Sequence, residues 1–300
     1  MSKVIMKEVL LPNGETLAYQ EREGGDIKVL LVHGNMTSSK HWDLVIENMD
    51  DKFKVYAVDL RGFGRSSYQQ PIMSIKDFSD DLKLFADQIG LSNFAIAGWS
   101  TGGAVGMQFV ADYPGNCNKL ILLASASTRG YPLDGKLTEM EVPRRLTMHE
   151  EIKQDLMRTI PIQTAYDTND VAMLKLIWNS VIYTHNQPEP DRYEEYVQDM
   201  RTQRNLAEVY HALNTFNISH KSNGLVEGNG RVDDIHVPVL VLYGERDMVV
   251  VREMTNELIG DLGKKAKVVE LKNCGHSALV DDLPQLLNAM EQFLDREVQV

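Results

Sequence analysis

Short, continuously apolar runs alternate with longer amphipathic segments along most of this chain. Strand-like runs and the helix-like stretches that follow them occupy 28–33 and 40–49, 54–59 and 75–89, and 94–97 and 104–113, with a further strand-like run at 119–124. Strands that are apolar on both faces, separated by helices, are typical of a parallel sheet covered on each side. We therefore expect an α/β fold with a mostly parallel central sheet flanked by helices.

The alternation stops after Ala126 and resumes near residue 237. From Thr128 to about Arg231 no strand-like run is apparent, and the helical stretches there lie at 150–158, 171–183 and 192–216, punctuated by Pro161, Pro188 and Pro190. Strand character then returns at 237–244 and 266–271, with helices expected at 253–259 and 283–294. This pattern predicts one core, 1–127 and 232–300, with a helical cap, 128–231, inserted after the strand that ends near residue 124.

Composition limits the classes of partner and compartment. The 300 residues are 43% apolar, and their formal charge of −12 is spread along the chain, which argues against binding to nucleic acid or to an anionic membrane surface. No apolar stretch is long enough to span a bilayer. The two cysteines, Cys117 and Cys274, have neither disulfide-framework nor metal-ligand spacing, which favours a reducing cytoplasm. Packing is the expected role of Cys274.

The first residues resemble a β-hairpin more than a targeting signal. Met1 to Leu17 alternate apolar and polar side chains and include Asn13-Gly14, a strong turn sequence. They lack the apolar core of a secretory signal.

A serine follows the strand-like run at 94–97 in the segment Gly98-Trp99-Ser100-Thr101-Gly102-Gly103. Glycines on both sides of Ser100 suit a sharp, strained turn from strand to helix, because larger side chains would collide there. The helix that follows would direct its N-terminal N–H groups at negative charge developing near the serine during acyl transfer. The segment thus predicts a nucleophile elbow with Ser100 as the nucleophile.

Serine catalysis also requires a base and a carboxylate that orients it. Asp247 follows the strand at 237–244 after a short turn, and His276 follows the strand at 266–271 through Asn273-Cys274-Gly275. Ligands of parallel sheets bind at the carboxyl ends of strands, so these residues should lie beside Ser100. A helix cap or turn residue is the alternative role for each of them alone. The order Ser, Asp, His favours a catalytic triad.

The loop after the first parallel strand is the candidate for an oxyanion hole. Gly34 permits a sharp turn after His33, so that the N–H of Asn35 can join that of Thr101 in binding an oxyanion. An ordinary loop capped by Ser38 or Ser39 is the alternative. His33 is expected to brace the loop. The glycine-rich segment 59–66 lacks nucleotide-binding spacing and is expected to be a structural turn.

Three apolar residues are candidates for contact with substrate. Trp99 adjoins the proposed nucleophile, Met36 lies in the predicted oxyanion loop, and Trp178 lies in the inserted segment. Packing within the core or the cap is the alternative role for both tryptophans.

These motifs together resemble the α/β-hydrolase superfamily over essentially the whole chain. The resemblance rests on His33-Gly34-Asn35, Asp59 to Ser66, the Gly98 to Gly103 elbow, Gly244 to Asp247 and Gly275-His276. It implies Ser100 as nucleophile, His276 as base, Asp247 as the orienting acid and the Asn35 and Thr101 N–H groups as oxyanion donors. It also implies a helical cap over the site. Related epoxide hydrolases and haloalkane dehalogenases use an aspartate nucleophile, and Ser100 argues against that chemistry.

The stretches 33–42, 59–68, 98–109 and 122–132 are further similar to bacterial intracellular poly(3-hydroxybutyrate) depolymerases. The predicted activity is carboxylic ester hydrolysis through an acyl-enzyme, without metal or organic cofactor, acting on a polyester or its oligomers. A small-molecule carboxylesterase or lactonase would use the same catalytic residues. A non-catalytic ligand receptor on the same fold is a third possibility, against which the complete Ser-Asp-His set argues. An aminopeptidase would need the acidic residues Glu139, Glu141, Glu150 and Glu151 to bind an amine, whereas such residues usually face solvent. The oligomeric state is open.

Overall fold

A computed structural model describes residues 3–296, and its central feature is an eight-stranded sheet in the order β1-β2-β4-β3-β5-β6-β9-β10. The strands are β1 (Val4–Leu10), β2 (Thr16–Arg22), β3 (Ile27–Val32), β4 (Phe53–Val58), β5 (Phe94–Trp99), β6 (Cys117–Leu123), β9 (Val239–Gly244) and β10 (Ala266–Leu271). β1 pairs with β2 and β2 with β4 antiparallel, and the other neighbours are parallel. The predicted α/β class and mostly parallel sheet are confirmed, as is the N-terminal hairpin over its described residues.

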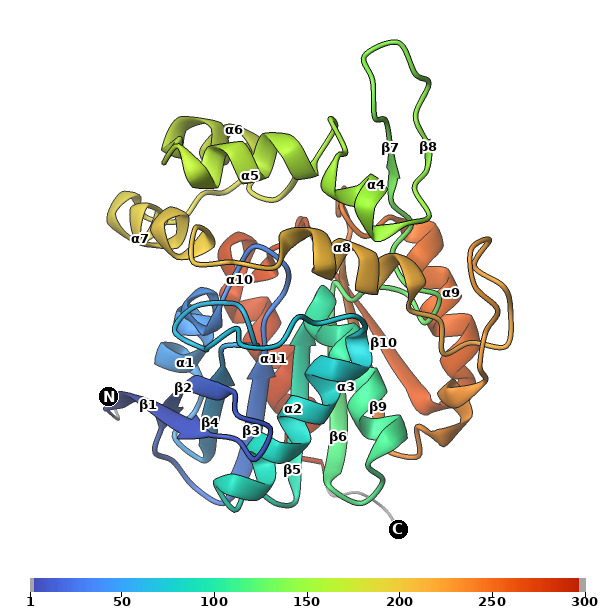
Figure 1. Ribbon diagram of the computed structural model, residues 1–300. Helices are drawn as coiled ribbons and strands as arrows, with labels where there is room; N and C mark the ends of the chain where they lie inside the picture. Colours follow the sequence, from blue (N-terminus) through green and yellow to red (C-terminus); the bar gives the residue numbers. More distant parts are fainter. Residues whose placement is uncertain (1–2, 297–300) are drawn as a thin grey trace.

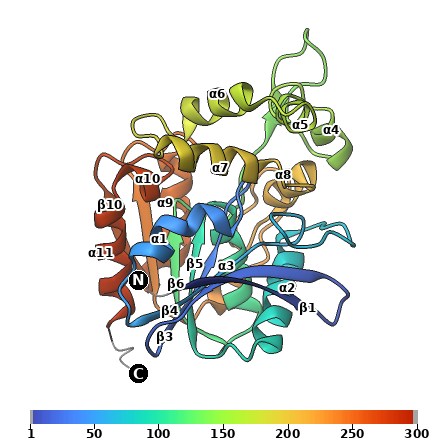
Figure 2. The same ribbon diagram turned by 90° about the vertical axis from the view of Figure 1, so that its left-hand side faces the viewer.

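Helices cover both faces of this sheet, as Figures 1 and 2 show. Around the sheet lie α1 (Asp43–Asn48), α2 (Ile75–Gln88), α3 (Thr101–Asp112), α9 (Arg252–Leu262), α10 (Ala278–Asp281) and α11 (Leu283–Leu294), with short 3-10 helices at Ser39–Trp42, Arg231–Asp234 and Gly263–Lys265. Successive residues of a strand face opposite sides. Leu30 and Val32 accordingly pack in the cluster with α2, α3 and α9, whereas Val29 and Leu31 pack in the cluster with α1 and α11.

The helices of the segment 128–231 lie across the carboxyl ends of the parallel strands, and the chain after them returns along the side of the core (Figure 1). Its helices are α4 (His149–Lys153), α5 (Thr159–Asp167), α6 (Val171–Val181), α7 (Pro190–Met200) and α8 (Leu206–Thr215). A hairpin with the two-residue strands β7 (Asp134–Gly135) and β8 (Arg144–Arg145) projects beyond them. The sequence predicted no strands in this segment, so these two short strands correct that prediction.

Helix boundaries in this segment also differ from those predicted. The expected helix at 150–158 is shorter and is followed by α5, in which Pro161 is the third residue. Proline is tolerated there because the first N–H groups of a helix have no partner within it. The stretch 192–216 forms two helices, α7 and α8, separated by residues 201–205.

Within residues 3–296, none of the helices combines the length and the apolar character needed to cross a membrane. Both cysteines are buried free thiols. Burial raises the pKa of Cys274 to about 12, so this thiol stays protonated near neutral pH, in keeping with a packing role.

Candidate active site

Ser100 sits at the junction of β5 and α3 in a backbone conformation that is unusual for serine. Its φ and ψ are 56° and −116°, outside the regions that residues with a side chain ordinarily adopt. The neighbouring backbones pack so closely that a Cβ atom on Gly98 would lie 2.2 Å from the carbonyl oxygen of Gly102. A Cβ on Gly102 would in turn lie 2.1 Å from the Val32 oxygen. These close contacts explain why both positions of the elbow are glycine.

His276 and Asp247 come from the loops that follow β10 and β9. The Nδ1–H of His276 donates to Asp247, with 2.9 Å to Oδ2 and 3.1 Å to Oδ1, and both side chains are at most 4% exposed. The N–H groups of Val249 and Val250 also donate to Asp247 Oδ1, at 2.8 and 2.9 Å. With Nδ1 held by the carboxylate, Nε2 of the neutral ring is left free to accept a proton.

The loop that carries His276 is tied to the rest of the site by two further hydrogen bonds. Trp99 Nε1 donates to the His276 carbonyl oxygen at 2.9 Å, and the Gly275 N–H donates to Asp281 Oδ2 at 2.7 Å. Trp99 is 2% exposed and therefore contributes mainly to the wall and the support of the site. Among the described residues, no hydrogen bond joins Ser100 Oγ to the His276 ring; a longer distance is common before substrate binds.

The predicted oxyanion loop passes directly over Ser100. A Cβ on Gly34 would lie 3.0 Å from Ser100 Cβ, so a larger residue would require the loop or Ser100 to shift by a few tenths of an ångström. Asn35 follows, and its side-chain oxygen accepts a hydrogen bond from Gln203 Nε2 at 2.7 Å. Thr101 is the first residue of α3, where backbone N–H groups have no partner within the helix.

His33 braces this loop from inside the core. Its Nδ1–H donates to the Gly34 carbonyl at 2.7 Å, and its Nε2 accepts the Leu60 N–H at 3.0 Å. Burial lowers the pKa of His33 to about 4, so the ring is neutral at physiological pH. Asp59 completes the support, since its carboxylate accepts the N–H groups of Ser39 and Arg65, each at 2.9 Å. The segment 59–66 is thus a structural turn.

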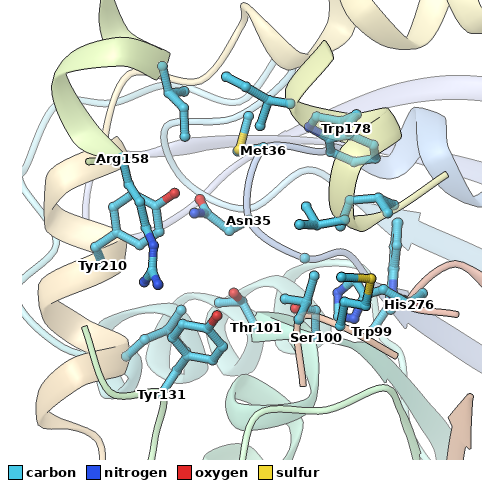
Figure 3. Close-up of a pocket in the computed structure, with 18 of the residues that line it drawn as sticks. Asn35, Met36, Trp99, Ser100, Thr101, Tyr131, Arg158, Trp178, Tyr210 and His276 are labelled. Atoms are coloured by element: carbon cyan, nitrogen blue, oxygen red, sulfur yellow. Dashed lines mark hydrogen bonds between the residues drawn. The ribbon is translucent and has the colours of Figure 1, made fainter. Parts of the chain in front are cut away.

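A cavity of about 310 Å³ lies between the core and the inserted segment, and Ser100 and His276 open onto it (Figure 3). All of the candidates for substrate contact and for the oxyanion hole line it as well, namely Asn35, Met36, Trp99, Thr101 and Trp178. Asp247 lies behind His276. Met36 has a φ of 60°, and Trp178, from α6, is 3% exposed.

Tyr131, Arg158 and Tyr210 also line the cavity, and they were not expected from the sequence. They come from the loop after β6, from the start of α5 and from α8. In Figure 3 they gather on the side of the cavity opposite Trp178, Trp99 and His276. No local pattern marks them, because their position depends on how the helices of the inserted segment pack.

Residues 28–283 match the model of a family described as the alpha/beta hydrolase fold. The chain is similar to a pimeloyl-[acyl-carrier protein] methyl ester esterase of Photorhabdus laumondii, with 22% identity over 94% of this chain and 97% of that protein. A bifunctional esterase/perhydrolase of Acinetobacter calcoaceticus is 26% identical over 90% of this chain and 93% of the relative. In structure, the chain is similar to the enol-lactonase of Burkholderia xenovorans, with a TM-score of 0.72, 18% identity, and coverage of 97% of this chain and all of that one.

Proposed function

Since the chain belongs to the alpha/beta hydrolase fold family, we propose that it hydrolyses carboxylic esters of small molecules through a Ser100, His276 and Asp247 triad. One observation carries the proposal. Ser100 and His276 open onto the same cavity, and Nδ1 of the His276 ring is hydrogen-bonded to the buried Asp247. The similarity to an esterase, a perhydrolase with esterase activity and a lactonase supports ester or lactone substrates.

The reaction begins when Ser100 Oγ attacks the ester carbonyl carbon and His276 Nε2 takes the hydroxyl proton. Negative charge develops on the carbonyl oxygen, which the N–H groups of Asn35 and Thr101 stabilise. His276 then gives its proton to the departing alkoxide, which leaves an acyl-enzyme on Ser100. Water, deprotonated by the same ring, attacks the acyl carbon; the bond from that carbon to Ser100 Oγ then breaks, the ring returns the proton to Oγ, and the acid is released. Asp247 holds the ring in the required tautomer and stabilises its charged form.

The size of the cavity favours small esters and lactones. At about 310 Å³ it lies at the lower end of the range of small-molecule sites. Most of its wall is apolar, with Trp99, Trp178 and Ile182 among the lining residues. Such a wall suits a short acyl or alkyl chain, and the enclosing helices limit access of bulk water to the acyl-enzyme.

Hydrolysis of a panel of methyl esters and lactones, followed by titration of the released acid, tests this function. The wild-type chain should release acid, and Ser100→Ala should lower the rate to the uncatalysed background. Ser92→Ala is a matched control, because Ser92 lies in an exposed loop away from the cavity, and it should keep the wild-type rate. A Ser100→Ala variant with the wild-type rate would rule out the proposed nucleophile.

A polyester such as poly(3-hydroxybutyrate) is a second candidate substrate, and one observation favours it. The inserted segment exposes several large apolar side chains, among them Met140 at 94%, Val142 at 83% and Leu176 at 65%. Exposed apolar groups of this kind suit contact with an apolar particle. Release of 3-hydroxybutyrate from amorphous polymer, compared with hydrolysis of methyl 3-hydroxybutyrate, tests it; hydrolysis of the monomer ester alone would exclude the polymer.

A further inference from the structure

Arg158 places an unpaired positive charge at the candidate active site. The side chain is partly buried and lines the cavity that contains Ser100, and its Nη1 atom is inaccessible to solvent and has no hydrogen-bond partner. Within residues 3–296, the guanidinium group of Arg158 forms no ion pair and no hydrogen bond. A buried, unpaired guanidinium donor is costly, because it loses its hydration without gaining a partner.

The location on α5 adds to this cost. Arg158 is the N-cap residue of α5, at the positive end of the helix dipole, where a negative charge would be favoured. The nearby carboxylate of Asp155 does not neutralise the side chain. Its two oxygens accept the backbone N–H groups of Lys136, Met157 and Arg158 itself, at 2.9 to 3.2 Å. The arginine is therefore not explained by an ion pair that supports the fold.

Two tyrosines flank the guanidinium. Figure 3 shows the Arg158 side chain directed into the cavity between the rings of Tyr210 and Tyr131. Burial raises the pKa of Tyr131, and the positive charge of Arg158 acts in the opposite direction; the same two causes, in the same order, apply to Tyr210. Both phenols thus stay protonated and can donate. Neither hydroxyl has a hydrogen-bond partner among the described residues.

The hydroxyl group of Thr101 is a fourth polar group of the cavity, and it lies next to the nucleophile in the sequence. Thr101 Oγ1 is buried without a partner, and Thr101 directly follows Ser100. The cavity thus has an unsatisfied polar side, formed by Arg158, Tyr131, Tyr210 and Thr101, and an apolar side near Trp178. A substrate that fills it should place an anionic group and an ester at a fixed separation.

We infer that the substrate of this ester hydrolase carries a carboxylate, which binds to Arg158 and the hydroxyl groups of Tyr131 and Tyr210 while its ester bond lies at Ser100. The inference rests on the proposed ester hydrolysis and names the substrate class. One planar guanidinium matches the two oxygens of a carboxylate, and the phenols supply further donors. A phosphate dianion would leave one negative charge uncompensated, because Arg158 is the one arginine, lysine, aspartate or glutamate among the described lining residues.

Pairs of methyl esters that differ only in their terminal group test this inference. The monomethyl esters of succinic, glutaric and adipic acids carry a terminal carboxylate, and the matched neutral esters carry a carboxamide in its place. For at least one chain length, wild-type kcat/KM should be about 10- to 100-fold higher for the carboxylate. A second pair, 3-acetoxybutanoate and its amide, places the carboxylate on the alcohol side and shows which part of the substrate Arg158 binds.

Variants at Arg158 separate recognition from catalysis. Arg158→Gln should lose the preference for the carboxylate, mainly through a higher KM for the carboxylate esters, so that the ratio of kcat/KM between the two members of each pair falls towards one. Arg158→Lys should keep part of the preference, since the charge remains without the planar pair of donors. Arg65→Gln removes the same charge from an exposed position outside the cavity and should behave like the wild type.

The results distinguish failure of the inference from failure of the proposed function. Equal wild-type kcat/KM for both members of every pair, or equal losses on both in Arg158→Gln, would overturn the carboxylate subsite while ester hydrolysis stands. No turnover of any ester, neutral or charged, would instead reject the proposed function.

Discussion

Ser100 keeps a backbone conformation that costs free energy wherever the surrounding structure does not impose it. Here the close contacts of Gly98, Gly102 and Gly34 impose it, so the hydroxyl projects from the end of β5 into the cavity. The other residues of the proposed triad are fixed by hydrogen bonds. Asp247 receives three hydrogen-bond donors, and one of them is the His276 ring.

Replacing the orienting acid should reduce catalysis far more than folding. Asp247→Asn keeps a side-chain oxygen for the Val249 and Val250 N–H groups, but it no longer selects the reactive tautomer of His276. We expect kcat to fall by about a thousandfold or more, with little change in KM. Steady-state kinetics measures the loss, and thermal melting monitored by circular dichroism controls for folding. A kcat within tenfold of wild type, with the melt unchanged, would contradict the proposed role.

The buried His33 should make stability depend on pH. Its pKa falls from 6.5 to about 4 on folding, so between these pH values the unfolded chain binds a proton that the folded chain does not. The free energy of unfolding should therefore decrease as pH falls from about 6.5 to about 4, by roughly 3 kcal/mol from this group alone.

Other groups also titrate in that pH range. The contribution of His33 is therefore measured as the difference in free energy of unfolding between wild type and a His33 variant. Denaturant unfolding of wild type and of His33→Gln at several pH values isolates the contribution of His33. The difference in stability between the two should shrink as pH falls. A difference that stays constant from pH 7 to pH 4 would mean that His33 is not held neutral.

At the scale of elements, the turn between β5 and α3 is a tight backbone crossing in the site. Gly98→Ala should destabilise the chain by about 3 kcal/mol or more, because its Cβ would meet the backbone of Gly102 and Gly103 at 2.2 to 2.6 Å. Gly260→Ala is the matched comparison, since a Cβ there has no neighbour within 4 Å and Gly260 lies within α9. It should stabilise by about 0.5–1 kcal/mol. Chemical denaturation compares the two, and equal effects would refute this account of the elbow.

The sequence predicts the elements of the core better than those of the inserted segment, for a physical reason. β9 is a short, continuously apolar and buried run, and β10 and α11 have the expected bounds, Ala266–Leu271 and Leu283–Leu294. The boundary between α7 and α8 instead depends on tertiary contacts. Gln203 binds Asn35, and Asn205 Nδ2 donates to the Arg61 carbonyl at 2.8 Å, both partners lying far away in the sequence.

The candidate site divides in the same way. Ser100, Asp247 and His276 could be proposed from sequence because each follows a recognisable strand, and parallel strands bring their carboxyl ends together. Arg158 could not be proposed from sequence, because the property that marks it is a guanidinium without an ion-pair or hydrogen-bond partner. That property depends on how α5 packs over the cavity, and α5 is far from the strands in the sequence.

For the whole molecule, the inserted segment and the core share one apolar cluster. Trp99 and Trp42 of the core pack in the same cluster as Trp178, Tyr196 and Met200 of α6 and α7. The walls of the cavity therefore depend on both parts of the chain. Because the cluster is shared, the inserted segment should unfold with the core under strong denaturant and differ from it only in local opening.

Hydrogen exchange should reveal that difference under native conditions. All six residues of β5 are buried, whereas only Leu174 and Trp178 are buried among the eleven residues of α6. Peptides from α6 should exchange much faster than peptides from β5 in a mass-spectrometric time course, because less buried surface opposes local opening. Equal protection of both would show that the inserted segment is as rigid as the sheet.

The most direct test of the central claim is reaction of the whole chain with a fluorophosphonate, which modifies only an activated serine. Intact mass spectrometry should show one adduct per chain, peptide mapping should place it on Ser100, and Ser100→Ala should remain unmodified. His276→Gln should react far more slowly, because the serine loses its base. An unmodified wild-type chain, or an adduct that persists in Ser100→Ala, would contradict the assignment of Ser100 as the nucleophile.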